Sequence, residues 1–283
     1  MQEGRASRTA SRVALRRASH QLLDRPIVFE DPLAMKIIRW DAAELLKANP
    51  AHFDRGMFAK YLRAFLAARS RIAEDVIADA VAKGCRQVVV LGAGLDTFAF
   101  RQTHADVRVF EVDHPATQAW KKRRLADTAI EVPPTVVFVP VDFERQNLRD
   151  SLTKAGLDAS RPVIFSWLGV TPYLEEAAIW QTLKDISAFA TTGGGVVFDY
   201  SIPPSSMGFI QRFLFRRVAR RVAKAGEPFR SYFDPAALAR GLAEVGFTNV
   251  TNFGPAEING RFFDGRADRL KVSGTGHIMV ALR

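Results

Sequence analysis

Two glycines and two acidic residues are spaced so that they could form one ligand-binding site. Gly92 and Gly94 form a Gly-x-Gly turn directly after an apolar run, residues 87–91. Glycine lets the backbone approach a ligand without interference from a Cβ atom. In doubly wound sheets the first such turn lies at the crevice where cofactors bind. Asp113 and Asp142 end the next two apolar runs, so we expect both carboxylates at the same edge of one sheet.

The residues that follow the glycine turn indicate the kind of ligand. A dinucleotide site uses Gly-x-Gly-x-x-Gly, with the diphosphate at the N-terminus of the next helix. Here Thr97 replaces the third glycine, and Asp96 would repel a diphosphate. A cationic sulfonium ligand without phosphates tolerates an acid at this position, because the two charges are opposite. The pattern therefore favours S-adenosylmethionine over a dinucleotide as the cofactor.

The two strand-end acids have distinct expected roles. Asp113 lies about 20 residues beyond the glycine turn, where an acid can accept hydrogen bonds from ribose hydroxyls. Its alternative role is to cap the helix that begins near His114. Asp142 could accept a hydrogen bond from the adenine amino group while the backbone N–H of Phe143 reaches a ring nitrogen. An ordinary turn at the end of a strand is the alternative for this pair.

A sheet with helices on both faces would position these residues. The runs typical of buried strands are residues 87–91, 107–113, 135–142, 162–166, 195–200, 247–250 and 276–282. Helical patterns at 116–126, 147–155, 175–190 and 235–245 separate most of them, which predicts a doubly wound α/β fold. The link between the last two runs is rich in Gly and Asp and leaves no room for a crossover helix. This ending predicts an antiparallel last strand inserted into the sheet, as in class I methyltransferases.

The first 84 residues are expected to form helices beside the core. Asp31 is a candidate N-cap with Pro32 at the first helical position, and Pro50 ends that helix. A second helix is predicted over 58–82, ended by Gly84. We therefore expect one structural domain, with a helical lid and cofactor-carboxylate segment over 1–84. The methyltransferase-like core would occupy 85–283, with a cap insertion at 203–233.

Composition limits the classes of function. Cys85 is the single cysteine among 283 residues, so neither a disulfide framework nor a thiolate metal site is expected, and a cytoplasmic location is the default. No metal-ligating constellation is visible, and no window approaches the roughly 20 apolar residues of a membrane span.

The net charge is +10, concentrated in a basic N-terminal helix and in residues 212–221. Nucleic acid is one possible partner for such patches, but an anionic small substrate fits better. The Arg-rich start also resembles an organellar transit peptide, although a folded lid is the preferred interpretation.

Several segments together resemble the leucine carboxyl methyltransferase family. They resemble more closely its bacterial branch of S-adenosylmethionine-dependent methyltransferases, which includes polyketide carboxyl O-methyltransferases. The resemblance covers residues 7–283 and rests on the segments 25–34, 68–71, 87–97, 110–115 and 172–174. It implies a class I methyltransferase with a Rossmann-like sheet, extra N-terminal helices and S-adenosylmethionine as cofactor.

The resemblance also implies roles for single residues. Arg69 matches the arginine that pairs with the methionine carboxylate of the cofactor, a task suited to a guanidinium. The two glycines would lie beside the methionine portion, and the roles of Asp113, Asp142 and Phe143 agree with those argued above. The chain departs from the family at Leu168, where an acid usually binds the cofactor's amino group. Another acceptor is therefore needed, such as a backbone carbonyl or Ser166.

The expected reaction is O-methylation of a small acidic molecule. A carboxylate acceptor is already ionised at pH 7, whereas a phenol would benefit from a general base, and no base is apparent. Catalytic residues therefore stay unassigned, and the candidates on the substrate side are Tyr173, Tyr200, Tyr232 and Arg230, with Arg12 and Arg16 as further possible anchors for an acid. The alternatives are a nucleotide-dependent oxidoreductase, or a non-catalytic or nucleic-acid-binding protein that keeps the fold.

Overall fold

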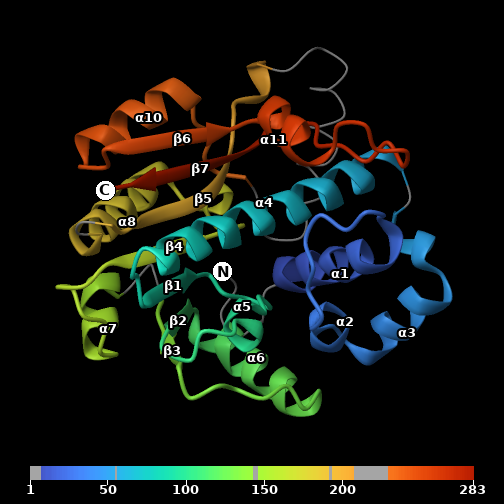
Figure 1. Ribbon diagram of the computed structural model, residues 1–283, viewed down its shortest axis with the longest axis horizontal. Helices are drawn as coiled ribbons and strands as arrows, with labels where there is room; N and C mark the ends of the chain where they lie inside the picture. Colours follow the sequence, from blue (N-terminus) through green and yellow to red (C-terminus); the bar gives the residue numbers. More distant parts are fainter. Residues whose placement is uncertain (1–7, 55, 143–145, 191–192, 207–228) are drawn as a thin grey trace.

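The chain folds around a seven-stranded sheet in the computed structural model, which describes residues 8–54, 56–142, 146–190, 193–206 and 229–283. The strand order is β3-β2-β1-β4-β5-β7-β6 (Figure 1). Strands β1 to β5 run parallel, and β7 pairs antiparallel with both β5 and β6. The strands are β1 (Gln87–Leu91), β2 (Arg108–Asp113), β3 (Val136–Pro140), β4 (Val163–Trp167), β5 (Gly195–Ser201), β6 (Asn249–Phe253) and β7 (Gly276–Leu282). The predicted α/β sheet with an inserted antiparallel strand is confirmed.

The central strands are apolar on both faces because helices cover both faces. Every residue of β1 and β4 is buried. On one face, the strands pack against α7 (Leu148–Lys154), α8 (Glu176–Phe189) and α10 (Pro235–Glu244). On the other face they meet α4 (Met57–Ala82), α5 (Phe98–Arg101) and α11 (Pro255–Phe262). Figure 1 shows α4 crossing the sheet as the longest helix of the view.

The connection between the last two strands contains a helix that was not predicted. The sequence predicts no crossover helix in this link, and α11, which lies between β6 and β7, is a short helix that joins antiparallel neighbours. Pro255 starts this helix, and the Glu257 side chain accepts a hydrogen bond from the Gly254 N–H at 2.9 Å. This cap satisfies a backbone donor that a short helix leaves open. The strand order is unaffected, because antiparallel neighbours need no crossover helix.

The N-terminal segment contains more breaks than predicted. It forms α1 (Arg8–Leu23), α2 (Ala34–Ile37), α3 (Trp40–Ala48) and a 3₁₀ turn (Pro50–Asp54) before α4. Asp31 is not the N-cap, because α2 begins at Ala34 after Leu33. The Asp31 carboxylate accepts from the Leu33 N–H in a turn and is otherwise bound to Arg17 and Thr97. A long-range ion pair therefore took the place of the predicted local cap. Gly84 follows the end of α4 with a φ of 98°, as expected.

The N-terminal helices share buried surface with the end of α6 (Pro115–Asp127). Their common cluster contains Ala14 and Ala18 of α1, Ile37 and Leu46 of the next helices, and Leu125 of α6. Figure 1 shows α1, α2 and α3 gathered beside the sheet rather than on one of its faces. Of the two basic segments, residues 8–23 form α1, whereas 212–221 lie outside the described residues, as does most of the expected cap insertion.

Within the described ranges, none of the helices combines the length and the apolarity needed to cross a bilayer. The same part of the chain contains no group of three or more His, Cys, Asp or Glu side chains suited to a metal ion.

Candidate functional site

The glycine turn follows β1 and needs both of its glycines. Gly92 has a φ of 64° and Gly94 a φ of 45°, a region that side chains other than glycine rarely occupy. A Cβ atom on Gly92 would lie 2.3 Å from Cγ2 of Val170, and one on Gly94 would lie 3.1 Å from the Cβ of Ala10. The turn is therefore closely packed between the loop after β4 and helix α1.

Asp113 holds this turn from the end of β2. Its Oδ2 accepts a hydrogen bond from the Gly94 N–H at 2.6 Å, and its Oδ1 accepts from the His114 N–H at 2.7 Å. The side chain is buried, and burial raises the pKa of Asp113 despite these two hydrogen bonds. The capping alternative is not observed, because His114 is the N-cap of α6 and its ring accepts from the Ala116 N–H.

Asp142 lies at the same edge of the sheet, two residues beyond β3. The neighbouring Val141 N–H donates to the Asp113 carbonyl at 2.9 Å, which joins the ends of the two strands. The Asp142 N–H donates to Oε1 of Gln146 at 2.8 Å. The structure therefore brings the glycine turn, Asp113 and Asp142 together. Phe143, the other predicted adenine contact, lies outside the described residues.

Arg69 of α4 reaches the same edge from the far side of the glycine turn. Its Nη1 is 2.6 Å from Oδ2 of Asp199 on β5, and both side chains are more than nine-tenths buried. Oδ1 of Asp199 accepts from the Gly169 N–H at 2.5 Å. Gly169 belongs to the loop that follows β4. Ser166, another residue singled out from the sequence, is buried near the end of that strand. Sequence reasoning singled out Arg69 and Ser166 but missed Asp199.

A second buried ion pair attaches α1 to the glycine turn. Arg17 donates to the Leu95 carbonyl at 2.6 Å, and its Nε lies 2.6 Å from Oδ2 of Asp31. The Thr97 hydroxyl donates to the same carboxylate oxygen at 2.7 Å. Asp96 keeps 27% of its side chain exposed and lies 4.0 Å from Arg17. Burial acts to raise the pKa of Asp96, but the nearby positive charges of Arg17, Lys121 and Arg101 outweigh it and lower the pKa.

Glu111 of β2 makes a further buried ion pair below Asp113. Its Oε1 is 2.7 Å from Nζ of Lys121 on α6, and both side chains are almost fully buried. Burial raises the pKa of Glu111 to about 7, against the opposing charge of Lys121. The sequence offered one signal for this pair, an acid two residues before Asp113 in an otherwise apolar strand.

Three of the four substrate-side candidates gather beside the loop after β4. The Tyr173 ring stacks on Phe229 with centroids 5.6 Å apart, and the Arg230 N–H donates to the Pro172 carbonyl at 2.7 Å. The exposed Arg230 guanidinium lies 3.2 Å from Glu175. Tyr232 follows in the same segment, and burial raises its pKa. Residues 229–233 and 170–175 therefore lie side by side.

The fourth candidate, Tyr200, lies within the core. It is 2% exposed, and its hydroxyl donates to Oδ1 of Asn252 on β6 at 2.8 Å. Burial, with a smaller contribution from the charge of Asp234, raises its pKa. Of the two further anchors, Arg12 is exposed on α1 and Arg16 donates to the Ala59 carbonyl at 3.2 Å.

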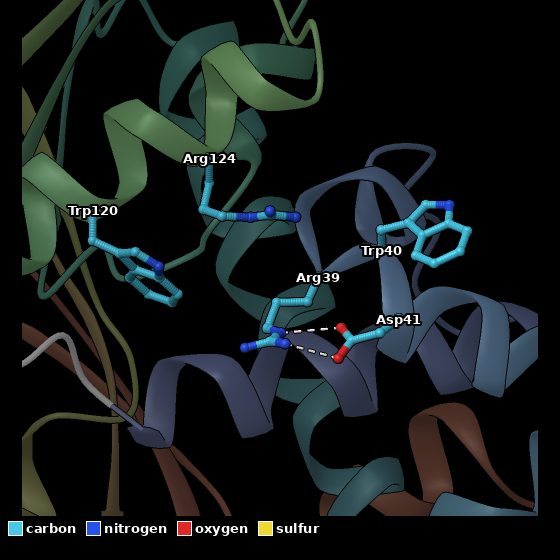
Figure 2. A pocket seen from close by; sticks show the side chains of 5 residues that line it. All are labelled: Arg39, Trp40, Asp41, Trp120 and Arg124. Atoms are coloured by element: carbon cyan, nitrogen blue, oxygen red, sulfur yellow. Dashed lines mark hydrogen bonds and ion pairs between the residues drawn. The ribbon is translucent and has the colours of Figure 1, made fainter.

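A shallow groove of about 480 Å³ lies elsewhere, between α3 and α6. Figure 2 shows Trp120 and Arg124 extending from α6, with the ion pair of Arg39 and Asp41 near them. Trp40 completes the lining. The groove contains none of the predicted site residues, and its open shape makes it a poorer ligand site than the sheet edge.

Comparisons with known proteins bear on the family and the fold. A family model described as leucine carboxyl methyltransferase matches residues 10–187. A Bacillus subtilis protein named as an S-adenosyl-L-methionine-dependent methyltransferase, YktD, is 30% identical, and the match covers 100% of both chains. A crystal structure from Thermobifida fusca, described as that of a methyltransferase, has a TM-score of 0.55 at 15% identity, covering 96% of this chain and 94% of that one. A DUF574 family protein from Streptomyces avermitilis has a TM-score of 0.52 at 18% identity, covering 95% and 97%. At these identities the two structures show a shared fold alone.

Proposed function

The chain belongs to the leucine carboxyl methyltransferase family, and from this we propose that it methylates a carboxylate or phenolic oxygen of a small acidic molecule, with S-adenosylmethionine as the methyl donor. The single observation that carries the proposal is the convergence of Gly94, Asp113 and Arg69 at one edge of the sheet. Methyltransferase activity and the cofactor follow from the family. The acceptor is the part that we propose from the site.

The residues at this edge fit an adenosylated amino acid. The backbone of the glycine turn offers a surface without Cβ atoms, where a ligand can approach closely. Asp113 and Asp142 supply acceptors at neighbouring strand ends, suited to ribose hydroxyls and an adenine amino group. Nε of Arg69 is buried and has no hydrogen-bond partner within the described part of the chain. A guanidinium with unused donor capacity suits a ligand carboxylate.

The chain's residues need only bind, orient and exclude water for this reaction. When bound, S-adenosylmethionine supplies a methyl group activated by its sulfonium. Proximity and alignment of an acceptor oxygen with that methyl group account for much of the rate of such displacements. A carboxylate acceptor is ionised at pH 7 and requires no general base. We assign Arg230 and Tyr173 to the acceptor because Tyr173 follows β4, beside the predicted cofactor site, and the Arg230 backbone is hydrogen-bonded to the same loop at Pro172.

Ligand-induced stabilisation tests the cofactor against the oxidoreductase alternative. S-adenosylhomocysteine at about 100 times its dissociation constant should stabilise the fold by roughly 2.7 kcal/mol. For a chain of this size we expect a rise in melting temperature of about 5–10 °C. NAD and NADP should leave the melting temperature unchanged, because Asp96 disfavours a diphosphate. A shift with NAD or NADP but none with S-adenosylhomocysteine would contradict the proposal.

The acceptor can be identified with radiolabelled S-adenosylmethionine and a panel of small carboxylic and phenolic acids. Methyl esters are hydrolysed by mild base, whereas phenyl methyl ethers survive it. Base treatment of the labelled product therefore separates carboxylate from phenol methylation. Label transferred to nitrogen-containing acceptors alone would argue against O-methylation.

Asp113→Ala should weaken S-adenosylhomocysteine binding by about 1–3 kcal/mol, which is the cost of losing a buried charged acceptor. The substitution removes the expected ribose contact and also frees the Gly94 N–H. Calorimetry on the variant measures the change. Asp106→Ala is a suitable control, because this exposed acid lies just before β2 and pairs with Arg86. Unchanged affinity in Asp113→Ala would reject the role of this residue.

A further inference from the structure

The buried pair of Arg69 and Asp199 has features that its role in the fold does not require. The two side chains come from α4 and β5, 130 residues apart in the sequence, and are 8% and 5% exposed. A buried ion pair gives little net stability, since the cost of removing two charges from water offsets their attraction. A hydrophobic pair would serve the fold equally well. Stability alone therefore does not account for this pair.

Each partner retains unused hydrogen-bonding capacity. Asp199 accepts one hydrogen bond from Arg69 on Oδ2 and one from Gly169 on Oδ1, and a carboxylate oxygen can accept two. Nε of Arg69 is buried without a partner among the described residues. A guanidinium beside a carboxylate is the electrostatic complement of a zwitterion, because each charge of the pair faces an opposite charge of an α-amino acid.

The pair lies against the glycine turn through the loop after β4. A Cβ atom on Gly169 would be 3.0 Å from Nη2 of Arg69, so only a glycine lets the guanidinium approach this closely. The next residue, Val170, is the residue that a Cβ on Gly92 would strike. The preceding residue, Leu168, packs its side chain into an apolar cluster. The loop itself supplies no carboxylate at this point, and the adjacent strand β5 supplies one through Asp199.

We propose that Asp199 accepts the α-ammonium group of the cofactor, beside Arg69, to which the family resemblance already assigns the α-carboxylate. The pair thereby selects ligands that carry an intact amino-acid group. The inference rests on the proposed function, since it requires an adenosylated amino acid at this edge of the sheet. In the family that the chain resembles, an acid at the position of Leu168 usually binds the amino group of the cofactor. Here Asp199, on the neighbouring strand β5, would bind it instead.

Calorimetry with two adenosine ligands tests the proposal by binding alone. S-adenosylhomocysteine carries the amino-acid group, and 5′-methylthioadenosine lacks it. In Asp199→Asn the dissociation constant of S-adenosylhomocysteine should rise about 10–100-fold, as expected for the loss of a charged hydrogen bond. The dissociation constant of 5′-methylthioadenosine should stay within about twofold. The control Asp41→Asn alters an exposed carboxylate paired with Arg39 and should change neither constant.

A third ligand separates the ammonium contact from an indirect effect through Arg69. S-adenosyl-3-thiopropylamine keeps the ammonium group but lacks the carboxylate. Asp199→Asn should weaken its binding, whereas Arg69→Met should not. Weakening by Arg69→Met alone would overturn the assignment of Asp199 to the ammonium group.

The outcomes distinguish this inference from the proposed function. A wild-type chain that binds neither adenosine ligand would overturn both. Wild-type binding of S-adenosylhomocysteine with unchanged affinity in Asp199→Asn would overturn the inference alone, as would an equal loss for both ligands. Asp199→Asn leaves a buried charge on Arg69, which destabilises the fold. The double variant Arg69→Met/Asp199→Leu avoids this, and it should bind both ligands with similar affinity. A retained preference for S-adenosylhomocysteine in the double variant would contradict the proposal.

Discussion

Asp24→Asn will lower the free energy of unfolding by about 3–5 kcal/mol, the loss typical when one member of a buried ion pair is removed. Asp24 is 1% exposed and joins α1 to α4. Its two carboxylate oxygens accept from Nη2 and Nε of Arg63, each at 2.8 Å. Oδ2 also accepts from Nδ1 of His20 at 2.7 Å. The asparagine side chain has one acceptor oxygen in place of two. Its NH₂ group would face an N–H donor of Arg63 or His20 and could form no hydrogen bond with it.

The orientation of the His20 ring is fixed by the backbone, which makes Asp24 hard to replace. Nε2 of His20 accepts from the N–H groups of Val28 and Phe29 at 3.1 and 3.2 Å. Nδ1 therefore carries the proton and donates to Asp24. Loss of the carboxylate leaves this donor unsatisfied in the core and removes two hydrogen bonds from the Arg63 guanidinium.

The contribution of Asp24 should depend on pH with a definite sign. Burial acts to raise the pKa of Asp24, but the hydrogen bonds from His20 and Arg63 and the charge of Arg63 outweigh it and lower the pKa. A carboxyl with a depressed pKa stabilises the fold above its unfolded pKa of about 3.9, and this stabilisation is lost as the pH falls through the folded value. The difference between wild type and Asp24→Asn should therefore be constant near neutral pH and shrink below about pH 4.

Chemical denaturation of both chains between pH 3 and pH 8 measures this difference. Asp41→Asn is the matched control, because the same substitution there breaks a pair with Arg39 that is largely exposed. We expect no measurable change for this control. A loss in Asp24→Asn no larger than in Asp41→Asn would mean that the buried cluster does not hold the N-terminal helices.

Gly92→Ala will nearly abolish cofactor binding and destabilise the fold by about 2–5 kcal/mol. Alanine at a φ of 64° costs roughly 1–2 kcal/mol in backbone strain. Its Cβ would also lie 2.3 Å from Cγ2 of Val170, and overpacking of this kind costs about 1–3 kcal/mol. The least costly relief is movement of the glycine turn, which would disturb the Gly94 N–H bound by Asp113.

Two further variants separate the backbone strain of alanine at position 92 from its steric collision with Val170. Gly265→Ala has a similar φ of 72° but open space around the position, so it should show the backbone cost without loss of ligand binding. Val170→Ala removes the methyl group that collides, and Gly92→Ala/Val170→Ala should recover part of the stability and affinity. Calorimetry with S-adenosylhomocysteine and denaturation measure both quantities. Equal behaviour of Gly92→Ala and Gly265→Ala would show that close packing at the turn is unimportant.

The sheet was predictable because its signals are local. Continuous apolar runs such as residues 87–91 are typical of strands covered on both faces, and the alternation with helices predicts parallel connections. β1 and β7 match the predicted ranges, and the other strands differ from them by one to three residues at an end, as at β6, where the run begins at Phe247 and the strand at Asn249. Helix α11 was missed because its eight residues carry glycine and polar side chains of the kind that also form loops.

The N-terminal helices were harder to predict because their partners are distant in sequence. Asp31 and Pro32 have the local pattern of a helix start, yet Asp31 is held by Arg17 and Thr97 instead. Nothing in a local window indicates that Asp31 meets Thr97, which lies 66 residues later. The break between α2 and α3 has no proline or glycine to signal it.

The α/β architecture and the placement of Gly94, Asp113 and Asp142 at one edge follow from the sequence, because parallel strands end on the same side. Which charges meet depends on the tertiary structure. Arg17 with Asp31, Asp24 with Arg63 and Arg69 with Asp199 pair across 14, 39 and 130 residues. Electrostatic energy depends on distance in space and on burial, and neither is set by distance along the chain.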